Sequence, residues 1–480
     1  MSRHGIKIVL PGLLTGACAL VAFSWWQGAD PADTLGKRVP GMSGEPATVK
    51  GPTAVEIGEH FETFAASAPA GLDGSWPEFR GGHRDNVRAT GPPLADSWPA
   101  DGPPVLWSVA IGEGHAGPAV HRGRVYLLDY DEERTSDMLR CFSLANGAEL
   151  WRRWYGVRIP RNHGMSRTIP AVADGHVVTI GPKCHVMCVD AETGALRWGI
   201  DLVKRYGTEI PMWYTGQCPL IDDGVAVLAP AGDSVLLTGI DCQTGEMVWE
   251  TPNPDGFDMS HSSVMPAVIG GKRMYLYCGI GGIVGISAEA SDRGRLLWQS
   301  TAWDRSVIAP SPVVLDNGRI FLTAGYGGGA MVIRVKLSGD AFDVAVLREY
   351  KSSEGLASEQ HTPLLYDNCL FAVLPKDAGA LRNEFVCVSA ADPTTVLWSS
   401  GKTNRFGLGP YLLADGKFYV LSDDGTLTIL QASTRGYNEL AQADILDGHE
   451  AWAPMALADG RLLLRDNRSL ACIDVRAGTE

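Results

Sequence analysis

The sequence predicts an all-β fold, an eight-bladed β-propeller built from four-stranded antiparallel blades. One phrase recurs along the chain: an apolar strand, a turn that ends in Gly, and a Trp four residues after that Gly, as in 141–151, 188–198 and 239–249. Successive copies are spaced by roughly 48 residues, which suits one blade of four short strands. No long amphipathic pattern follows residue 66, so a helical repeat is excluded.

The blade count comes from a second phrase, a strand beside Pro that is followed by a turn and an apolar strand. Its eight prolines are Pro118, Pro170, Pro219, Pro266, Pro312, Pro363, Pro410 and Pro454. The last copy ends at residue 478 without a Trp strand, whereas Trp107 lies on a strand that precedes the first copy. We therefore expect residues 105–110 to complete the last blade and close the ring without an open edge. Seven blades are the main alternative.

The repeated Trp and Gly residues are expected to be architectural. A Trp on each outer strand can fill the space between blades while its indole N–H donates to a carbonyl oxygen. The Gly of the preceding turn permits a positive φ. The Trp residues are Trp107, Trp151, Trp198, Trp249, Trp298 and Trp398, with looser copies of the phrase at 334–348 and 429–441, and the Gly residues are Gly147, Gly194 and Gly245.

The ten cysteines are too sparse for a disulfide scaffold. Four of them share one repeat position, on the strand before the turn: Cys141, Cys188, Cys387 and Cys472. A small, buried, apolar side chain is expected there. Zinc binding within 184–188 is disfavoured, because neighbouring strand residues point to opposite faces of a sheet.

The N-terminal part predicts an anchor and a tether. Residues 8–26 carry no charged side chain and would span roughly 29 Å as a helix, about the thickness of a bilayer core. Basic residues precede them, so residues 1–26 are expected to be a membrane anchor with the remainder exported. A cleaved signal peptide and a lipid-modified Cys18 are the alternatives. Residues 27–75, with one helix-like stretch at 54–66, are expected to form a flexible linker, and 76–480 the propeller.

The charge balance argues against nucleic acid as a partner. The chain has 41 basic and 55 acidic residues, a net charge of −14, which repels phosphate backbones. Apolar residues make up 45% of the chain and charged residues 20%, values typical of a globular protein.

The loops that enter the innermost strands converge on the central channel of a propeller, so their polar and aromatic residues are candidates for a binding funnel. The candidates are His115, Arg167, Tyr214, His261, His361, Arg405 and Trp452. Such a funnel would suit an anionic or aromatic ligand, or a peptide segment. The alternative is that these side chains only satisfy exposed backbone carbonyls. No catalytic residue and no metal ligand is assigned, because no close-spaced motif of His and carboxylate residues is present.

Three segments resemble a known family. Asp190–Trp198 resembles the tryptophan-docking repeat of pyrroloquinoline-quinone (PQQ)-like propellers. That family includes quinoprotein alcohol dehydrogenases and the propeller lipoprotein of the outer-membrane β-barrel assembly machinery. Trp-Pro-Glu-Phe-Arg-Gly-Gly-His-Arg-Asp-Asn at 76–86, together with 111–119, resembles the opening of exported propellers from planctomycete-type bacteria. The resemblance covers 76–480 and implies the fold, whereas the family name describes the repeat and not a bound quinone.

The resemblance implies two functions of different classes. The first is a non-catalytic scaffold without a cofactor, tethered to the membrane and facing the periplasm or an equivalent exported compartment, whose loop face binds an envelope protein or a ligand. The second is a PQQ-dependent alcohol or sugar dehydrogenase, with PQQ and Ca²⁺ over the channel near His115, Arg167, Tyr214, His261 and Trp452. The chain has no adjacent Cys pair and no Cys-x-x-Cys-His haem motif, so the scaffold is preferred.

Overall fold

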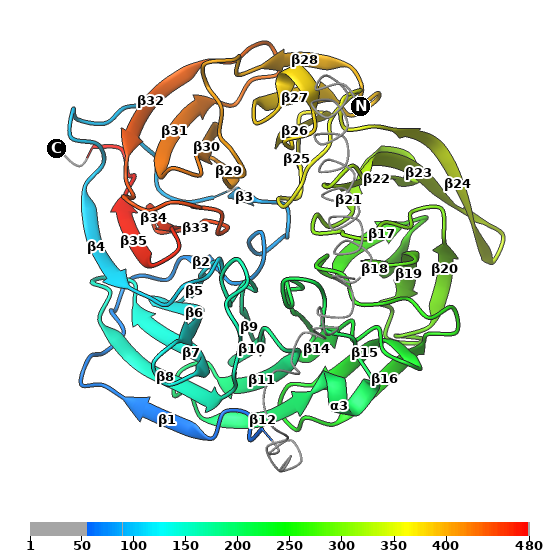
Figure 1. Cartoon of the computed structure of the whole chain (residues 1–480), viewed down its shortest axis with the longest axis horizontal. Coiled ribbons are helices and arrows are strands. Elements are labelled where there is room, and N and C mark those ends of the chain that lie inside the picture. The colour runs from blue at the N-terminus through cyan, green and yellow to red at the C-terminus, as the bar shows by residue number, and fades with distance from the viewer. Residues whose placement is uncertain (1–54, 89, 479–480) are drawn as a thin grey trace, which may run out of the picture. The chain divides into compact units, whose positions relative to one another are not determined.

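The computed structural model describes residues 55–88 and 90–478, and its strands form eight sheets arranged in a ring (Figure 1). The prediction of an all-β, eight-bladed propeller is therefore confirmed. Each blade is an antiparallel meander whose first strand lies innermost and whose fourth lies at the periphery. The anchor expected at 1–26 lies outside the described residues. Among those that are described, no helix combines the length and the apolar character needed to cross a membrane.

The first four blades follow one another along the chain. Blade 1 contains β5 (Ala119–His121), β6 (Arg124–Asp131), β7 (Ser136–Ser143) and β8 (Glu149–Gly156). Blade 2 contains β9 (Ala171–Ala173), β10 (His176–Ile180), β11 (His185–Asp190) and β12 (Leu196–Asp201), after which comes the short helix α3 (Leu202–Tyr206). Blade 3 contains β13 (Leu220–Asp222), β14 (Val225–Leu228), β15 (Val235–Asp241) and β16 (Met247–Pro252). Blade 4 contains β17 (Met265–Ile269), β18 (Lys272–Gly279), β19 (Gly282–Ser287) and β20 (Leu296–Ser300).

The next three blades repeat the pattern. Blade 5 contains β21 (Val313–Val314), β22 (Arg319–Ala324), β23 (Gly329–Ser338) and β24 (Ala341–Tyr350), with a 3₁₀ turn at Asp316–Gly318. Blade 6 contains β25 (Leu364–Tyr366), β26 (Cys369–Val373), β27 (Phe385–Ser389) and β28 (Val396–Ser399), with a 3₁₀ turn at Gly379–Leu381. Blade 7 contains β29 (Tyr411–Ala414), β30 (Lys417–Leu421), β31 (Thr426–Gln431) and β32 (Glu439–Asp444).

The last blade joins both ends of the propeller. Its first three strands are β33 (Ala456–Ala458), β34 (Arg461–Arg465) and β35 (Ser469–Asp474), and its outer strand is β4 (Val105–Ala110). Strands β35 and β4 pair antiparallel, with Cys472 opposite Trp107. The N-terminal strand thus completes the last blade, as the sequence predicted, and the ring has no unpaired end.

The Trp residues link each blade to the next. Trp107, Trp151, Trp198 and Trp398 donate from Nε1 to carbonyl oxygens in the following blade, at 3.0, 3.1, 2.9 and 2.9 Å. The expectation fails at two positions: Trp298 Nε1 contacts Met274 Sδ at 3.3 Å, and Trp249 Nε1 has no hydrogen-bond partner within the described chain. A Cβ at Gly147, Gly194 or Gly245 would lie 2.6 to 2.8 Å from the Trp ring of the preceding blade, so these glycines are needed for close packing as well as for their positive φ.

The residue opposite each Trp explains the cysteine pattern. In all eight blades the pairing of the two outer strands shifts by one residue next to this position, which is a β-bulge. A Cys faces the Trp in four blades and a Gly in two, while Arg348 and Ala441 replace the Trp in blades 5 and 7. The four cysteines are fully buried and unpaired, as expected for small filling side chains.

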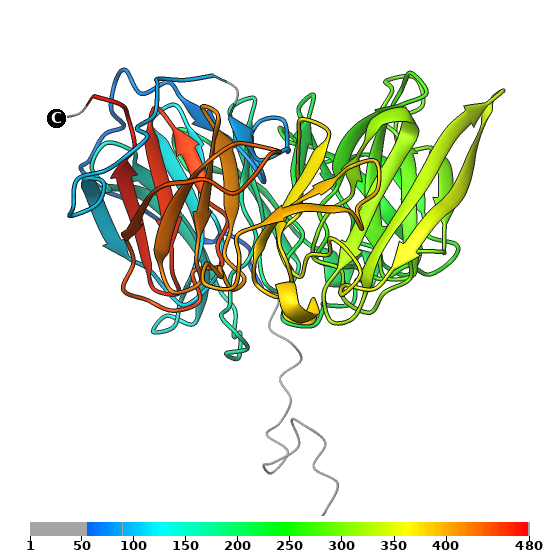
Figure 2. The ribbon, with the colours of Figure 1, turned by 90° about the horizontal axis from the view of Figure 1, so that it is seen from above.

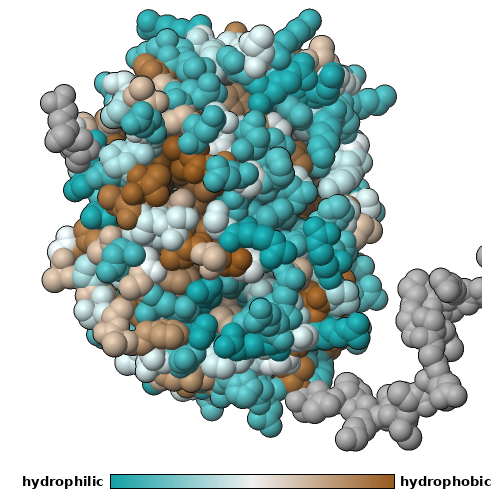
Figure 3. Space-filling model, turned by 60° about the vertical axis from the view of Figure 1, so that its left-hand side comes forward, coloured by the Kyte–Doolittle hydropathy of each residue, from teal (hydrophilic) through white to brown (hydrophobic). Residues whose placement is uncertain are grey.

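The segment before the propeller is more ordered than the sequence suggested. Residues 54–66 were expected to be helix-like within a flexible linker that ends at 75. Instead β1 (His60–Thr63) pairs with β8, and β2 (Ser75–Trp76) and β3 (Val87–Arg88) extend blades 1 and 7. The described part of the linker is therefore held against the propeller, because the open edge of β8 offers backbone groups that a further strand can satisfy. On the face seen in Figure 3, hydrophilic residues cover most of the right-hand part, and apolar residues gather in patches toward the left.

Candidate functional site

Residues 76–86, which we call the plug, lie across the central channel. Arg84 donates from Nη2 to the carbonyl oxygen of Pro219 in blade 3 (2.5 Å) and from Nη1 to that of Val264 in blade 4 (2.6 Å). Its Nε donates to Glu78 Oε2 at 2.8 Å. Figure 2 shows the N-terminal segment, in blue, across one end of the ring. A single buried side chain therefore joins two blades far from its own position in the sequence.

A second buried arginine extends the plug to the opposite side of the ring. Arg80 donates from Nη1 to the carbonyl oxygen of Thr362 (2.5 Å) and from Nη2 to that of Pro363 (3.1 Å), both in blade 6. Asn86 donates to the carbonyl oxygen of Tyr411 in blade 7 at 2.7 Å. Burial lowers the pKa of Arg80 to about 10, so the guanidinium remains charged at neutral pH and its charge is shared among carbonyl dipoles.

A hydrogen-bonded relay surrounds the channel next to the plug. The backbone N–H of Ile169 donates to Cys218 Sγ (3.2 Å), and that of Cys218 donates to Ser263 Oγ (3.0 Å). The N–H of Ser263 donates to Ser311 Oγ (3.0 Å), and that of Ser311 to Thr362 Oγ1 (2.9 Å). One relay thus connects blades 2 to 6, and it explains why small polar residues or Cys precede the innermost strands.

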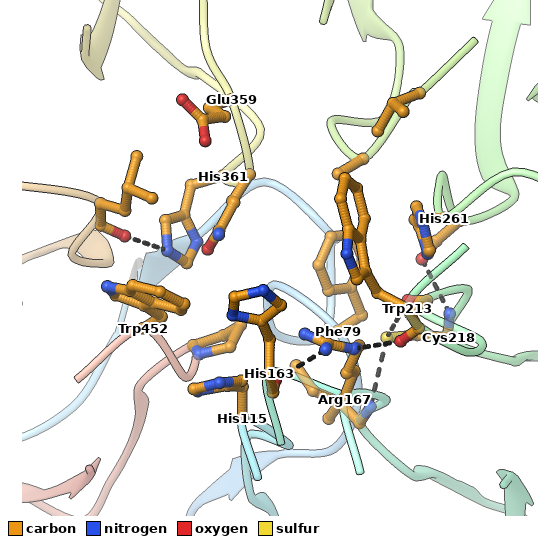
Figure 4. A pocket seen from close by; sticks show the side chains of 18 of the residues that line it. Phe79, His115, His163, Arg167, Trp213, Cys218, His261, Glu359, His361 and Trp452 are labelled. Atoms are coloured by element: carbon orange, nitrogen blue, oxygen red, sulfur yellow. Dashed lines mark hydrogen bonds between the residues drawn. The ribbon is translucent and has the colours of Figure 1, made fainter. Parts of the chain in front are cut away.

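The plug forms the floor of a pocket of about 240 Å³ whose mouth opens on the side of the loops that enter the innermost strands. Phe79 lies at the floor, and the walls come from loops of several blades (Figure 4). The walls include His115, His163, Arg167, Trp213, His261, Tyr326, Glu359, His361, Lys376 and Trp452. Since the plug blocks the channel, this mouth is the way in and out of the pocket.

One wall is an aromatic stack formed by loops of three blades. Trp213 stacks on Tyr326, with ring centroids 5.2 Å apart and an interplanar angle of 28°. It also stacks on His261, at 6.4 Å and 25°. Trp213 has a φ of 62° and Tyr326 a φ of 55°, a strained conformation for residues other than Gly. At Trp213 this conformation is held by Arg167 Nε, which donates to the carbonyl oxygen of Trp213 at 2.6 Å.

Trp452 and Trp213 lie on opposite sides of the pocket (Figure 4). The ring of His115 lies against that of Trp452, with centroids 4.9 Å apart. His115 is 6% exposed, and neither of its ring nitrogens has a hydrogen-bond partner among the described residues; Glu450 Oε2 is 3.9 Å from Nε2. Trp452 Nε1 is likewise unpaired within the described chain. Each of these nitrogens is shielded from solvent, so it becomes available to a bound molecule only if its ring turns toward the pocket.

Three histidines of the pocket, His115, His261 and His361, are neutral at physiological pH. Burial, with further repulsion from Arg167 and Arg465, lowers the pKa of His115 to about 3. Burial lowers the pKa of His261 and of His361 to about 4. Each neutral imidazole carries one donor and one acceptor nitrogen. The pocket therefore contains far less positive charge than its histidines suggest.

The charged side chains of the pocket are Arg167, Glu359 and Lys376, of which Arg167 is engaged with backbone carbonyls. Arg167 Nη2 donates to the carbonyl oxygens of Asn162 (2.9 Å) and His163 (2.7 Å), in addition to the bond from Nε to Trp213. Burial raises the pKa of Glu359, and the charge of Lys376 opposes this effect. Aromatic faces and neutral donor–acceptor groups consequently dominate the surface that a ligand would meet.

The structure brings five of the seven candidate residues together. His115, Arg167, His261, His361 and Trp452 line the pocket. Tyr214 and Arg405 do not: Tyr214 Oη donates to the carbonyl oxygen of Pro160 at 2.5 Å, and Arg405 donates to the carbonyls of Lys402, Arg382 and Ala380 at 3.0 to 3.3 Å. For these two residues the alternative interpretation, satisfaction of backbone carbonyls, describes the contacts.

Sequence reasoning missed Phe79, Tyr326, Glu359 and Lys376, which also line the pocket. Glu359 lies on the same loop as His361 but outside the position shared between blades, and Tyr326 and Lys376 lie on loops that follow the second strands of their blades. Phe79 carried a signal, since it belongs to the phrase at 76–86 on which the family resemblance rests. That phrase was used only to recognise the family, whereas its two arginines form the channel plug.

This geometry defines a class of protein: an eight-bladed propeller whose central channel holds a pocket that is open at one end. A family model described as the outer membrane protein assembly factor BamB matches residues 135–377, which is just over half of the chain. The chain therefore belongs to this PQQ-like propeller family. No curated protein sequence matches the chain.

Several solved structures share the fold at low sequence identity. A europium-containing methanol dehydrogenase aligns with a TM-score of 0.59 and 11% identity, over 82% of this chain and 89% of that chain. The quinohemoprotein alcohol dehydrogenase from Comamonas testosteroni aligns with a TM-score of 0.56 and 11% identity, over 85% and 81%. BamB from Moraxella catarrhalis aligns at 0.49 and 14% identity, over 77% and 99%. At these identities the first two alignments show the fold alone.

The pocket does not fit a calcium–quinone pair. Calcium takes six to eight oxygen ligands, of which several are normally carboxylates. Glu359 is the one carboxylate that lines the pocket, and the described residues contain no cluster of three or more His, Cys, Asp or Glu side chains able to hold a metal. Of the two lysine and arginine side chains in the described lining, Arg167 is engaged with carbonyls, which leaves Lys376 to meet an anionic quinone.

Proposed function

We propose that this protein is an exported, membrane-tethered propeller that acts as a non-catalytic binding scaffold in the cell envelope, with the channel pocket as its binding site. The observation that carries this proposal is the single-ended pocket itself. Its described lining consists mainly of aromatic faces and neutral polar side chains, and Glu359 is the one carboxylate in it, whereas the alternative, a calcium- and PQQ-dependent dehydrogenase, would require several oxygen ligands. Membership of the BamB-described family supports an envelope location and a role in binding.

The binding role is tested with a photoreactive amino acid in the full-length protein. Tyr326 is 58% exposed at the rim of the pocket, whereas Tyr366, 36% exposed, lies at the far end of its innermost strand. Irradiation of intact cells should give a cross-linked adduct from position 326 and none from position 366. Equal adducts at both positions, or no adduct at 326, would contradict binding at the channel mouth.

The non-catalytic role is tested by addition of PQQ and Ca²⁺ to the purified protein. We expect neither a thermal shift nor dye-linked oxidation of primary alcohols or sugars. Stabilisation accompanied by turnover would overturn the scaffold proposal and favour the dehydrogenase.

The tether is tested by the intact mass of the membrane-extracted protein. The proposed anchor requires that residues 1–26 remain on the mature chain. A mass that corresponds to removal of these residues would overturn the proposal of a membrane anchor, whereas the proposal that the protein is exported would still hold.

A further inference from the structure

We propose that the channel pocket binds one neutral, polyhydroxylated ring, such as a terminal sugar residue of a glycan, between its two aromatic walls. This inference rests on the proposed binding function and specifies the chemical class of the ligand. Three properties of the pocket support it: its size, its opposed aromatic faces, and its donor and acceptor groups.

The size of the pocket favours a single ring. Pockets that enclose drug-sized molecules usually measure about 300–1,000 Å³. The present pocket, about 240 Å³, lies below that range and is closed at its floor by Phe79. Since the mouth opens to solvent, a longer chain could extend outward from a ring held inside.

The aromatic walls offer two flat apolar surfaces. Trp452, backed by His115, lies on one side, and Trp213, backed by Tyr326 and His261, on the other (Figure 4). A sugar ring has apolar faces formed by C–H groups and a polar edge of hydroxyls. Its faces can pack on indole rings while its edge remains free to form hydrogen bonds.

The polar groups match hydroxyls better than anions. A hydroxyl both donates and accepts, and so do the neutral imidazoles of His115, His261 and His361. Within the described chain both ring nitrogens of His115, Nδ1 of His261 and Nε1 of Trp452 lack partners; each is shielded from solvent, so a hydroxyl reaches it only if the ring turns toward the pocket. An anion accepts only, so it would leave the acceptor nitrogens unsatisfied; Arg167 already donates to three carbonyls, which leaves Lys376 as the one further lysine or arginine in the described lining.

The test uses titrations of the full-length protein, followed by tryptophan fluorescence and by saturation-transfer NMR. The probes are methyl β-glucoside and N-acetylglucosamine as neutral rings, glucuronate as a charged ring, cyclohexanol as a ring with a single hydroxyl, and PQQ as an anionic aromatic. For a ligand of this size we expect the neutral sugars to bind with a Kd on the order of 1 mM. Glucuronate and cyclohexanol should bind at least tenfold more weakly.

Three variants locate the site. Trp452→Ala should weaken binding of the neutral sugars at least tenfold, since it removes one wall. His115→Phe keeps an aromatic ring but removes both nitrogens, so it should weaken sugar binding and leave the weak binding of cyclohexanol unchanged. Trp154→Ala, on the outer strand β8 far from the channel, is the matched control and should bind sugars like the parent. Circular dichroism verifies that each variant is folded.

Each other outcome overturns the assignment in a recognisable way. Binding of glucuronate or PQQ without the neutral sugars assigns an anionic ligand and leaves the channel-mouth scaffold intact. Sugar binding that survives Trp452→Ala, or that is lost equally in Trp154→Ala, places the sugar elsewhere. No sugar binding at 100 mM ends the sugar proposal, while the Tyr326 cross-link independently decides whether the mouth binds anything.

Discussion

Arg84 Nη2 lies 2.5 Å from the carbonyl oxygen of Pro219, so a side chain that precedes the first blade binds the third. Arg84 is only 2% exposed, so this bond forms away from water, where an unpaired charge or carbonyl group would destabilise the fold. The contact makes the plug part of the ring's structure and at the same time the floor of its pocket. Four predictions follow from such relationships.

Arg84→Met should destabilise the propeller by about 3 kcal/mol or more, since it leaves Glu78 and two buried carbonyls without their partner. The control is Arg295→Met, which removes a surface ion pair with Asp292 and should cost less than about 0.5 kcal/mol. Urea unfolding measures both. Similar losses in the two variants would show that the plug does not stabilise the ring.

Gly194→Ala should cost clearly more than Gly175→Ala. Both glycines have a positive φ, +69° and +78°, so either substitution strains the backbone by about 1–2 kcal/mol. A Cβ at 194 would also lie 2.7 Å from the Trp151 ring, whereas nothing lies within 4 Å of a Cβ at 175. The overpacking should add about 1–3 kcal/mol to the loss at 194. Equal losses in thermal or urea unfolding would contradict the packing role of the turn glycine.

His361→Gln should flatten the acid side of the stability profile. The pKa of His361 in the fold is about 4, below the value of about 6.5 in an unfolded chain. The unfolded chain therefore binds more protons between these values, and the free energy of unfolding falls as pH is lowered through this window. Glutamine can still donate to the carbonyl oxygen of Leu408, which His361 Nε2 approaches at 3.0 Å. Urea unfolding between pH 7 and pH 4.5 should show a smaller slope for the variant; an unchanged slope would refute it.

Asp137→Asn should show the opposite pH dependence. Burial raises the pKa of Asp137 to about 7, so the folded state binds more protons than the unfolded state between about pH 4 and pH 7. The stability that this carboxyl contributes is present at low pH and is lost as pH rises through 7. Asparagine stays neutral and can still accept from Tyr155 Oη, which donates to Oδ2 at 2.6 Å. The variant should gain stability over the parent at pH 8, and the gain should shrink at pH 5.

The repeat phrase was sufficient to predict the blades. Trp, Gly and Cys recur at fixed positions because each blade has a turn against which the Trp of the neighbouring blade must pack. Even the degenerate copies were located correctly, since Arg348 and Ala441 occupy the Trp position at the same β-bulge. The closing strand at 105–110 was predictable for the same reason.

The pocket was only partly predictable. His115, His261, His361 and Trp452 were found because each lies at an equivalent point before an innermost strand. Tyr214 and Arg405 lie at similar points, yet their side chains turn to neighbouring carbonyls, a choice that depends on the shape of individual loops. Neither the helix-like pattern at 54–66 nor the linker composition revealed that β1 adds to β8, since that pairing depends on a distant open edge.

By itself, the sequence determined the number of blades, their order and the way the ring closes, because these depend on interactions between adjacent repeats. Only the tertiary structure decided that Arg80 and Arg84 plug the channel, and that His115, His261 and His361 are neutral. Those properties depend on burial at a place where loops from several blades meet and exclude water. Burial of this kind produces no repeating pattern in the sequence.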